Sequence, residues 1–132
     1  MGIASIGVIR RQGMNLFKSF VEKAIEQDKR NNFAESKVEN KRIPKCFKEF
    51  YRLYNPIDVE VEIDNRFVHF IPAEELDRIS EEYNLESNCF IFATSEGDPI
   101  YYRDGKIYSC VFGRDGIIEE VLSDDLMSFF KI

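Results

Sequence analysis

Apolar and polar residues follow a helical period in the first part of the chain. From Asn15 and again from Pro44, apolar side chains recur every three or four positions, which predicts amphipathic helices over 15–30 and 44–54. Proline suits the start of the second helix, because the first helical turn leaves its backbone N–H groups unpaired. The polar stretch 31–42 between the helices is predicted to be a loop. The apolar positions of the first helix are Leu16, Phe17, Phe20, Val21, Ala24 and Ile25.

After Pro56 the period becomes two, which is typical of strands with one buried face and one exposed face. The pair Asp64-Asn65 separates the first two strands and can adopt the left-handed backbone of a tight hairpin turn. A short helix is predicted to follow Pro72, and Ser123 is predicted to cap a last helix that ends near the C-terminus. The predicted strands cover 59–63, 66–71, 89–93, 99–102, 107–112 and 117–121.

This order of elements, two helices followed by strands with one helix inserted and one at the end, predicts an α+β fold. We expect a single domain with a mainly antiparallel, twisted sheet and helices packed on one side, since 132 residues suffice for one ordinary domain. The domain is predicted to span 14–132. Residues 1–13 are apolar and then basic, and we interpret them as a leader or tag-like segment.

Charge is unevenly distributed along the chain. The sequence has 18 Lys and Arg against 24 Asp and Glu, but residues 1–50 carry a net +5 and residues 51–132 carry −11. An acidic surface repels nucleic acid and anionic membranes and attracts basic proteins. No apolar run reaches the roughly 18–20 residues that cross a bilayer, and the protein is predicted to be cytoplasmic with no membrane partner. The alternative is that the acidic residues only keep the protein soluble.

The candidate catalytic and metal-binding residues form no known motif. Cys46, Cys89 and Cys110 are far apart and have apolar neighbours, which indicates buried free thiols in a reducing compartment. His69 is the only histidine, and neither a metal site nor a Cys–His nucleophile has a supporting spacing. A carboxylate hydrolase would need two acids about 5–10 Å apart around a cleft, and no pattern selects such a pair. We therefore assign no metal or cofactor site, and these residues by themselves select no catalytic reaction.

Three segments resemble the motifs of one superfamily. The run from Ile43 to Asn55 is similar to a helix motif with proline at its start, aromatic residues at helical spacing and asparagine at its end. Phe70 to Leu76 resembles a short helix motif with the sequence Glu-Glu-Leu, and Phe90 to Tyr108 resembles a strand, an acidic glycine-containing loop and a second strand. These are motifs of the SUKH superfamily, which includes fungal cell-wall-synthesis regulators and many bacterial immunity proteins. The resemblance covers 15–132.

The resemblance implies a SUKH-like fold and a binding protein without catalytic activity. Bacterial members resemble antitoxins that neutralise a cognate toxin, often a nuclease or deaminase, and an acidic surface would suit a basic toxin. The alternative is a regulatory or scaffold module like the fungal members, with a partner that is not a toxin. In the superfamily the helix typically ends in Asn-Gly, whereas here Asn55 precedes Pro56, so the exit from this helix must differ.

The residues predicted to bind the partner lie in the acidic part of the chain. Acids alternate along one predicted strand and flank Gly97 in a loop, where they would mimic the charge of nucleic acid. One of two adjacent tyrosines would be an aromatic anchor, because neighbouring strand residues face opposite sides. Alternatively, the acids are ordinary exposed side chains, and the tyrosines are one core ring and one solvent-facing ring. The predicted partner-binding residues are Glu60, Glu62, Asp64, Glu96, Asp98, Tyr101 and Tyr102.

Overall fold

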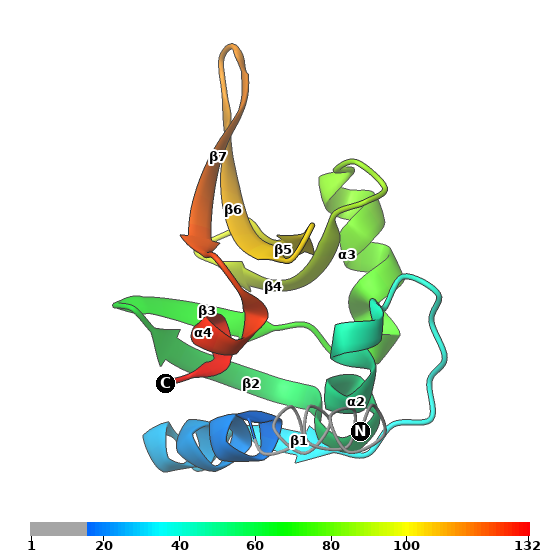
Figure 1. Cartoon of the computed structure of the whole chain (residues 1–132), viewed down its shortest axis with the longest axis vertical. Coiled ribbons are helices and arrows are strands. Elements are labelled where there is room, and N and C mark those ends of the chain that lie inside the picture. Colours follow the sequence, from blue (N-terminus) through cyan, green and yellow to red (C-terminus); the bar gives the residue numbers. More distant parts are fainter. Residues whose placement is uncertain (1–15) are drawn as a thin grey trace, which may run out of the picture.

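A computed structural model describes residues 16–132, in which each strand pairs with the next strand along the chain (Figure 1). Residues 16–27 form an N-terminal helix, and seven antiparallel strands follow in the order β1 to β7. The predicted α+β class and mainly antiparallel sheet are confirmed. The predicted leader, 1–13, lies outside the described residues. The further elements are β1 (Asn32–Ala34), α2 (Lys45–Tyr54), β2 (Asn55–Ile63), β3 (Arg66–Phe70), the 3₁₀ helix η1 (Ala73–Glu75), α3 (Leu76–Tyr83), β4 (Phe90–Ser95), β5 (Asp98–Arg103), β6 (Lys106–Gly113), β7 (Gly116–Ser123) and α4 (Leu126–Phe130).

Tight turns join most neighbouring strands from β2 onward. Three of these turns contain two successive residues with positive φ, a backbone whose twist matches that of the flanking antiparallel strands. Asx and glycine residues supply most of these positions because they adopt the left-handed conformation at low cost. The prediction of a turn at 64–65 is confirmed. The three pairs are Asp64-Asn65, Glu96-Gly97 and Asp104-Gly105.

Aromatic side chains from three helices pack on one face of the sheet and form the centre of the core. The N-terminal helix, α2 and α4 contribute to this cluster, together with rings from β3 and β4. Phe130 of α4 lies at the centre of this aromatic cluster. Its ring centroid is 4.9–6.2 Å from seven other ring centroids. Helix α4 therefore packs against the N-terminal helix, α2, β3 and β4. The seven neighbours are Phe17, Phe20, Phe47, Phe50, Phe70, Phe92 and Phe129.

Two local predictions in the N-terminal third are corrected by the structure. The predicted loop 31–42 contains β1, which pairs with β2 through contacts such as Asn32 with Asp58. A strand of three residues is too short to show an alternating pattern, so periodicity does not reveal it. Ile25, which the helical period places on the apolar stripe of the first helix, is 41% exposed.

The exit from α2 takes the form of a direct passage into β2. Asn55 has φ −57° and ψ 121°, an extended rather than left-handed backbone, as expected before proline. Its side chain is buried, accepts a hydrogen bond from the Ala73 backbone at 2.8 Å and donates to Glu74 at 3.3 Å. Asn55 thereby links the α2–β2 junction to η1.

The cap of α4 also differs from the expectation. Asp125, two residues after the predicted cap Ser123, accepts a hydrogen bond from the backbone N–H of Ser128 at 2.6 Å. The Ser123 hydroxyl donates instead to the backbone oxygen of Asp125. Both residue types favour helix N-termini, so sequence alone does not choose between them.

Replacing Asp125 with alanine is expected to lower the thermal unfolding midpoint by a few degrees, because one N-terminal donor of α4 loses its partner. The neighbouring Asp124→Ala is the matched control and should leave the midpoint unchanged. Hydrogen bonding to the Ser128 N–H lowers the pKa of Asp125 below its usual value of 3.8. The difference between the two variants should therefore persist above pH 4 and shrink as the pH falls further. Thermal unfolding followed by circular dichroism at several pH values measures it.

Candidate partner-binding site

The carboxylates of β2 lie on its exposed face, as predicted. Glu60 and Glu62 are exposed and alternate with the buried Val61. Their backbone groups are nevertheless occupied: the Glu60 N–H donates to the Asn31 side chain at 2.9 Å, and Gln27 exchanges hydrogen bonds of 2.8 and 3.1 Å with the backbone of Glu62. This edge of β2 is thus closed by side chains while its two carboxylates face solvent.

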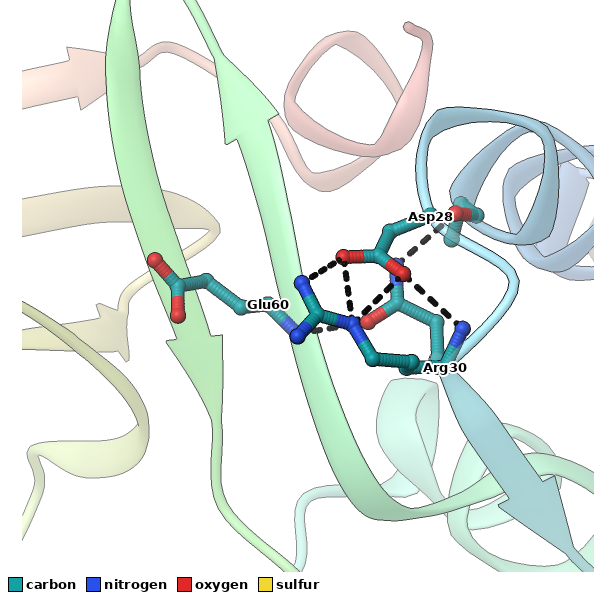
Figure 2. Close-up of polar contacts among 5 residues, drawn as sticks. Asp28, Arg30 and Glu60 are labelled. Carbon is teal, nitrogen blue, oxygen red and sulfur yellow. Dashed lines mark hydrogen bonds and ion pairs between the residues drawn. The ribbon is translucent and has the colours of Figure 1, made fainter.

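A shallow pocket of about 670 Å³ lies between the end of the N-terminal helix and the β2–β3 hairpin, bordered by Glu60 and Glu62. In it, Asp28 accepts hydrogen bonds from the Arg30 side chain and backbone at 2.7–3.2 Å, which lowers the pKa of Asp28 to about 2. Figure 2 shows the Glu60 carboxylate extending away from this pair. Arg30 is therefore paired with Asp28, and the Glu60 carboxylate remains available to contact a partner.

A second hollow, which we call the acidic groove, lies between the β2–β3 turn and the β6–β7 hairpin and has a volume of about 370 Å³. It brings together three predicted site residues, Asp64, Glu96 and Asp98, with Glu120 of β7. Arg66 is the only basic residue among the described residues that line it. Apolar surface in the groove comes from Val111 and Ile118.

The curl of the sheet creates this groove. Arg66 on β3 and Glu120 on β7 form an ion pair with 3.7 Å between Nη2 and Oε1. Four strand spacings separate β3 from β7, which would be roughly 19 Å in a flat sheet. In Figure 1 the β6–β7 hairpin bends away from the direction of β2 and β3. Residues that are distant both in sequence and in strand order therefore meet.

Tyr101 and Tyr102, the predicted aromatic anchors, both pack in or against the core. Tyr101 is only 1% exposed, and Tyr102 is half-buried with its ring 5.6 Å from that of Phe47. Tyr101 is therefore a core ring, whereas Tyr102 keeps part of its surface exposed, and a contact of either ring with a partner stays a prediction. Tyr101 is buried because its ring stacks on Tyr108 and its hydroxyl donates a hydrogen bond to Glu119.

This hydrogen bond belongs to a polar network across β5, β6 and β7. Arg103 donates two hydrogen bonds of 2.7 and 2.8 Å to the Glu119 carboxylate and lies over the Tyr108 ring, 4.3 Å from its centroid. The Arg103 guanidinium lowers the pKa of Glu119, and burial together with the Glu119 carboxylate raises the pKa of Tyr101. The network fixes β7 against the sheet and neutralises Glu119, while Glu120 next to it faces the acidic groove.

The three cysteines, which are candidate catalytic or metal-binding groups, are at least partly buried, whereas the single histidine is exposed. Cys110 is buried, Cys46 and Cys89 are half-buried, and burial raises the pKa of all three thiols, so little thiolate forms near neutral pH. His69 lies exposed on β3, opposite Glu60. Across residues 16–132, no three His, Cys, Asp or Glu side chains are grouped so as to hold a metal ion. No helix in this part of the chain is long and apolar enough to span a bilayer.

Sequence reasoning missed the contribution of β6 and β7 to the groove, namely Val111, Ile118 and Glu120. A signal was present in the run Ile117 to Glu120, where two apolar residues precede two acids. In a strand this run gives each face one isoleucine and one glutamate, so neither face is dedicated to a core. The structure agrees, because all residues of 111–121 are exposed.

No protein-family model matches this chain, and no curated protein or solved structure matches it significantly. The SUKH resemblance therefore continues to rest on the sequence motifs alone.

Proposed function

We propose that this protein is an immunity protein that binds and neutralises a basic toxin through the acidic groove. The observation that carries the proposal is the convergence of Asp64, Glu96, Asp98 and Glu120 from three hairpins. Asp64 borders both hollows, so the carboxylates form a continuous rim from β2 to β7. The described residues that line the two hollows include seven carboxylates and two arginines.

Such a rim suits a toxin that acts on nucleic acid. A nuclease must present basic surface to phosphate groups, and a row of carboxylates competes for the same surface. Long-range attraction speeds the encounter, and close charge pairs discriminate against other partners. A stable complex buries roughly 1,600 Å², so the contact would extend beyond the groove to neighbouring strands.

Co-expression with any toxin encoded by a neighbouring gene tests the proposal. We expect this protein to restore growth of cells that produce the toxin and to copurify with it. The double variant Asp64→Asn, Glu96→Asn should weaken toxin binding about tenfold or more at low salt, measured by calorimetry. Asparagine tolerates the left-handed backbone of both positions, so the turns should persist.

Asp104→Asn is the matched control, because Asp104 also occupies a left-handed turn position but does not line the groove. It should bind the toxin like the wild type. Failure of the wild type to protect against any neighbouring toxin would contradict the proposal. An isolated gene and capture of a defined partner that is not a toxin would favour a regulatory or scaffold module instead.

A further inference from the structure

The hairpin of β6 and β7 extends beyond the rest of the domain (Figure 1). Every residue of 111–121 is exposed, although five of them are large and apolar, with exposed fractions between 44% and 64%. Neighbouring exposed apolar side chains on a folded domain mark a binding surface more often than chance. The five are Val111, Phe112, Ile117, Ile118 and Val121.

The two edges of the sheet differ in their backbone hydrogen bonding. At one edge, β1 pairs with the first part of β2, and side chains of Asn31 and Gln27 bind the backbone of Glu60 and Glu62. At the other edge, within residues 16–132, β7 pairs with β6 alone. An exposed edge strand with unpaired backbone groups is a template for a further strand. The sheet can therefore be extended at β7.

The register of the hairpin shows which backbone groups are open. Gly113 pairs with Gly116 across a two-residue turn. In such a hairpin the residues that flank the turn form a hydrogen-bonded pair, and bonded and non-bonded pairs alternate from there. The backbone N–H and C=O groups of Ile117, Glu119 and Val121 therefore point towards the open edge.

The two faces beside β7 differ in chemistry. Ile118 and Glu120 line the acidic groove on one face. On the opposite face, Ile117 and Val121 flank Glu119, whose charge is already offset by its ion pair. Side chains of a strand alternate between faces, so an added strand would place every second side chain at the groove and the others beside apolar residues.

We propose that β7 binds an extended segment of a partner protein by strand addition, and that this segment alternates Lys or Arg with β-branched apolar residues. The inference rests on the proposed function, because the segment would belong to the basic toxin. Its cations would reach Glu96 and Asp98 while their aliphatic stems lie on Ile118. A second copy of this chain is the poorer occupant, since it would bring its own Glu120 and groove carboxylates alongside the first set.

Binding of two labelled peptides to the whole chain tests the proposal. One probe is an end-blocked octapeptide that alternates lysine with valine, and the other alternates glutamate with valine. In fluorescence anisotropy titrations, we expect the lysine peptide to bind and to weaken as salt is added, and the glutamate peptide not to bind.

The variant Ile117→Pro removes one outward N–H and places a ring in the path of an added strand, at an edge position where proline is tolerated. It should weaken binding of the lysine peptide about tenfold or more. Ile117→Thr is the matched control, because it keeps the N–H and a β-branched side chain. It should stay within a few fold of the wild type. Circular dichroism confirms that both variants are folded.

Absence of binding by the lysine peptide, or equal binding by wild type and folded Ile117→Pro, would overturn the proposal. So would light scattering that shows a wild-type dimer and a monomeric Ile117→Pro variant, since a second copy would then occupy β7. If Ile117→Pro does not fold, amide chemical shifts of the wild type decide: changes at β7 and the groove support strand addition, and changes confined elsewhere refute it.

The same variants separate this inference from the proposed function. If Ile117→Pro still protects cells against the toxin, docking at β7 is wrong while the immunity function holds. If the wild type binds the lysine peptide through β7 but protects against no toxin, the docking surface is correct and its partner is not a toxin.

Discussion

Phe130→Ala is expected to destabilise the protein by about 3–5 kcal/mol, which is a large share of the roughly 5–15 kcal/mol that holds a typical domain together. The ring is 1% exposed and contacts rings from the N-terminal helix, α2, β3 and β4. Its removal leaves a cavity in the middle of these elements, and they cannot all close on it at once. Urea unfolding followed by far-ultraviolet circular dichroism measures the loss.

Met127→Ala is the matched control, because Met127 lies on the same short helix but is 52% exposed. It should change the free energy of unfolding by less than about 0.5 kcal/mol. If Phe130→Ala cost as little as Met127→Ala, α4 would be a loosely attached end of the chain, and the central place of its aromatic ring in the core would be refuted. Removal of the last three residues, 130–132, should resemble Phe130→Ala.

Glu119→Gln is expected to cost about 1.5 kcal/mol at pH 7, the low end for hydrogen bonds to charged groups, because a third of the Glu119 side chain is exposed. The substitution keeps an oxygen that can accept from Tyr101 but removes the charge that binds Arg103. The pKa of Glu119 is lowered in the folded state, so its contribution is present above the usual value of 4.5 and is lost as the pH falls through the lowered pKa.

The difference in unfolding free energy between wild type and Glu119→Gln should therefore be constant from pH 7 to about 5 and narrow below that. Chemical unfolding at a series of pH values measures it. Glu120→Gln is the control, since the adjacent Glu120 is 65% exposed and its ion pair with Arg66 is long. It should have little effect on stability. If the difference in unfolding free energy between wild type and Glu119→Gln stayed constant down to pH 3, the charge of Glu119 would make no contribution to stability.

Local pattern predicted most of the elements. The helical spacing of Phe47 and Phe50 and the alternation of Val59 and Val61 are direct consequences of how helices and strands present side chains to a core. Turn residues were equally informative, because a pair such as Asp64-Asn65 satisfies a backbone conformation that few residues adopt. Local pattern did not predict the short strand β1, and it did not distinguish Asp125 from Ser123 as the cap of α4.

The candidate site was predictable in part. The exposure of Glu60 and Glu62 follows from alternation within one strand, and sequence was sufficient to infer it. The contribution of Glu120 depends on which strands face each other across the curl of the sheet, and no local pattern contains that information. Tyr101 shows the same limit, since its burial depends on partners from β6 and β7 that no spacing around it indicates.

By itself the sequence determined an acidic α+β domain, six of the seven strands found in residues 16–132, and the face of β2 that carries the carboxylates. Only the tertiary structure decided that Asp64, Glu96, Asp98 and Glu120 share one groove, and that within residues 16–132 the edge of the sheet at β7 is open while side chains close the edge at β2. The physical reason is that periodicity reports contacts between a segment and the core, whereas sheet curl and edge closure arise from contacts between segments far apart in the chain.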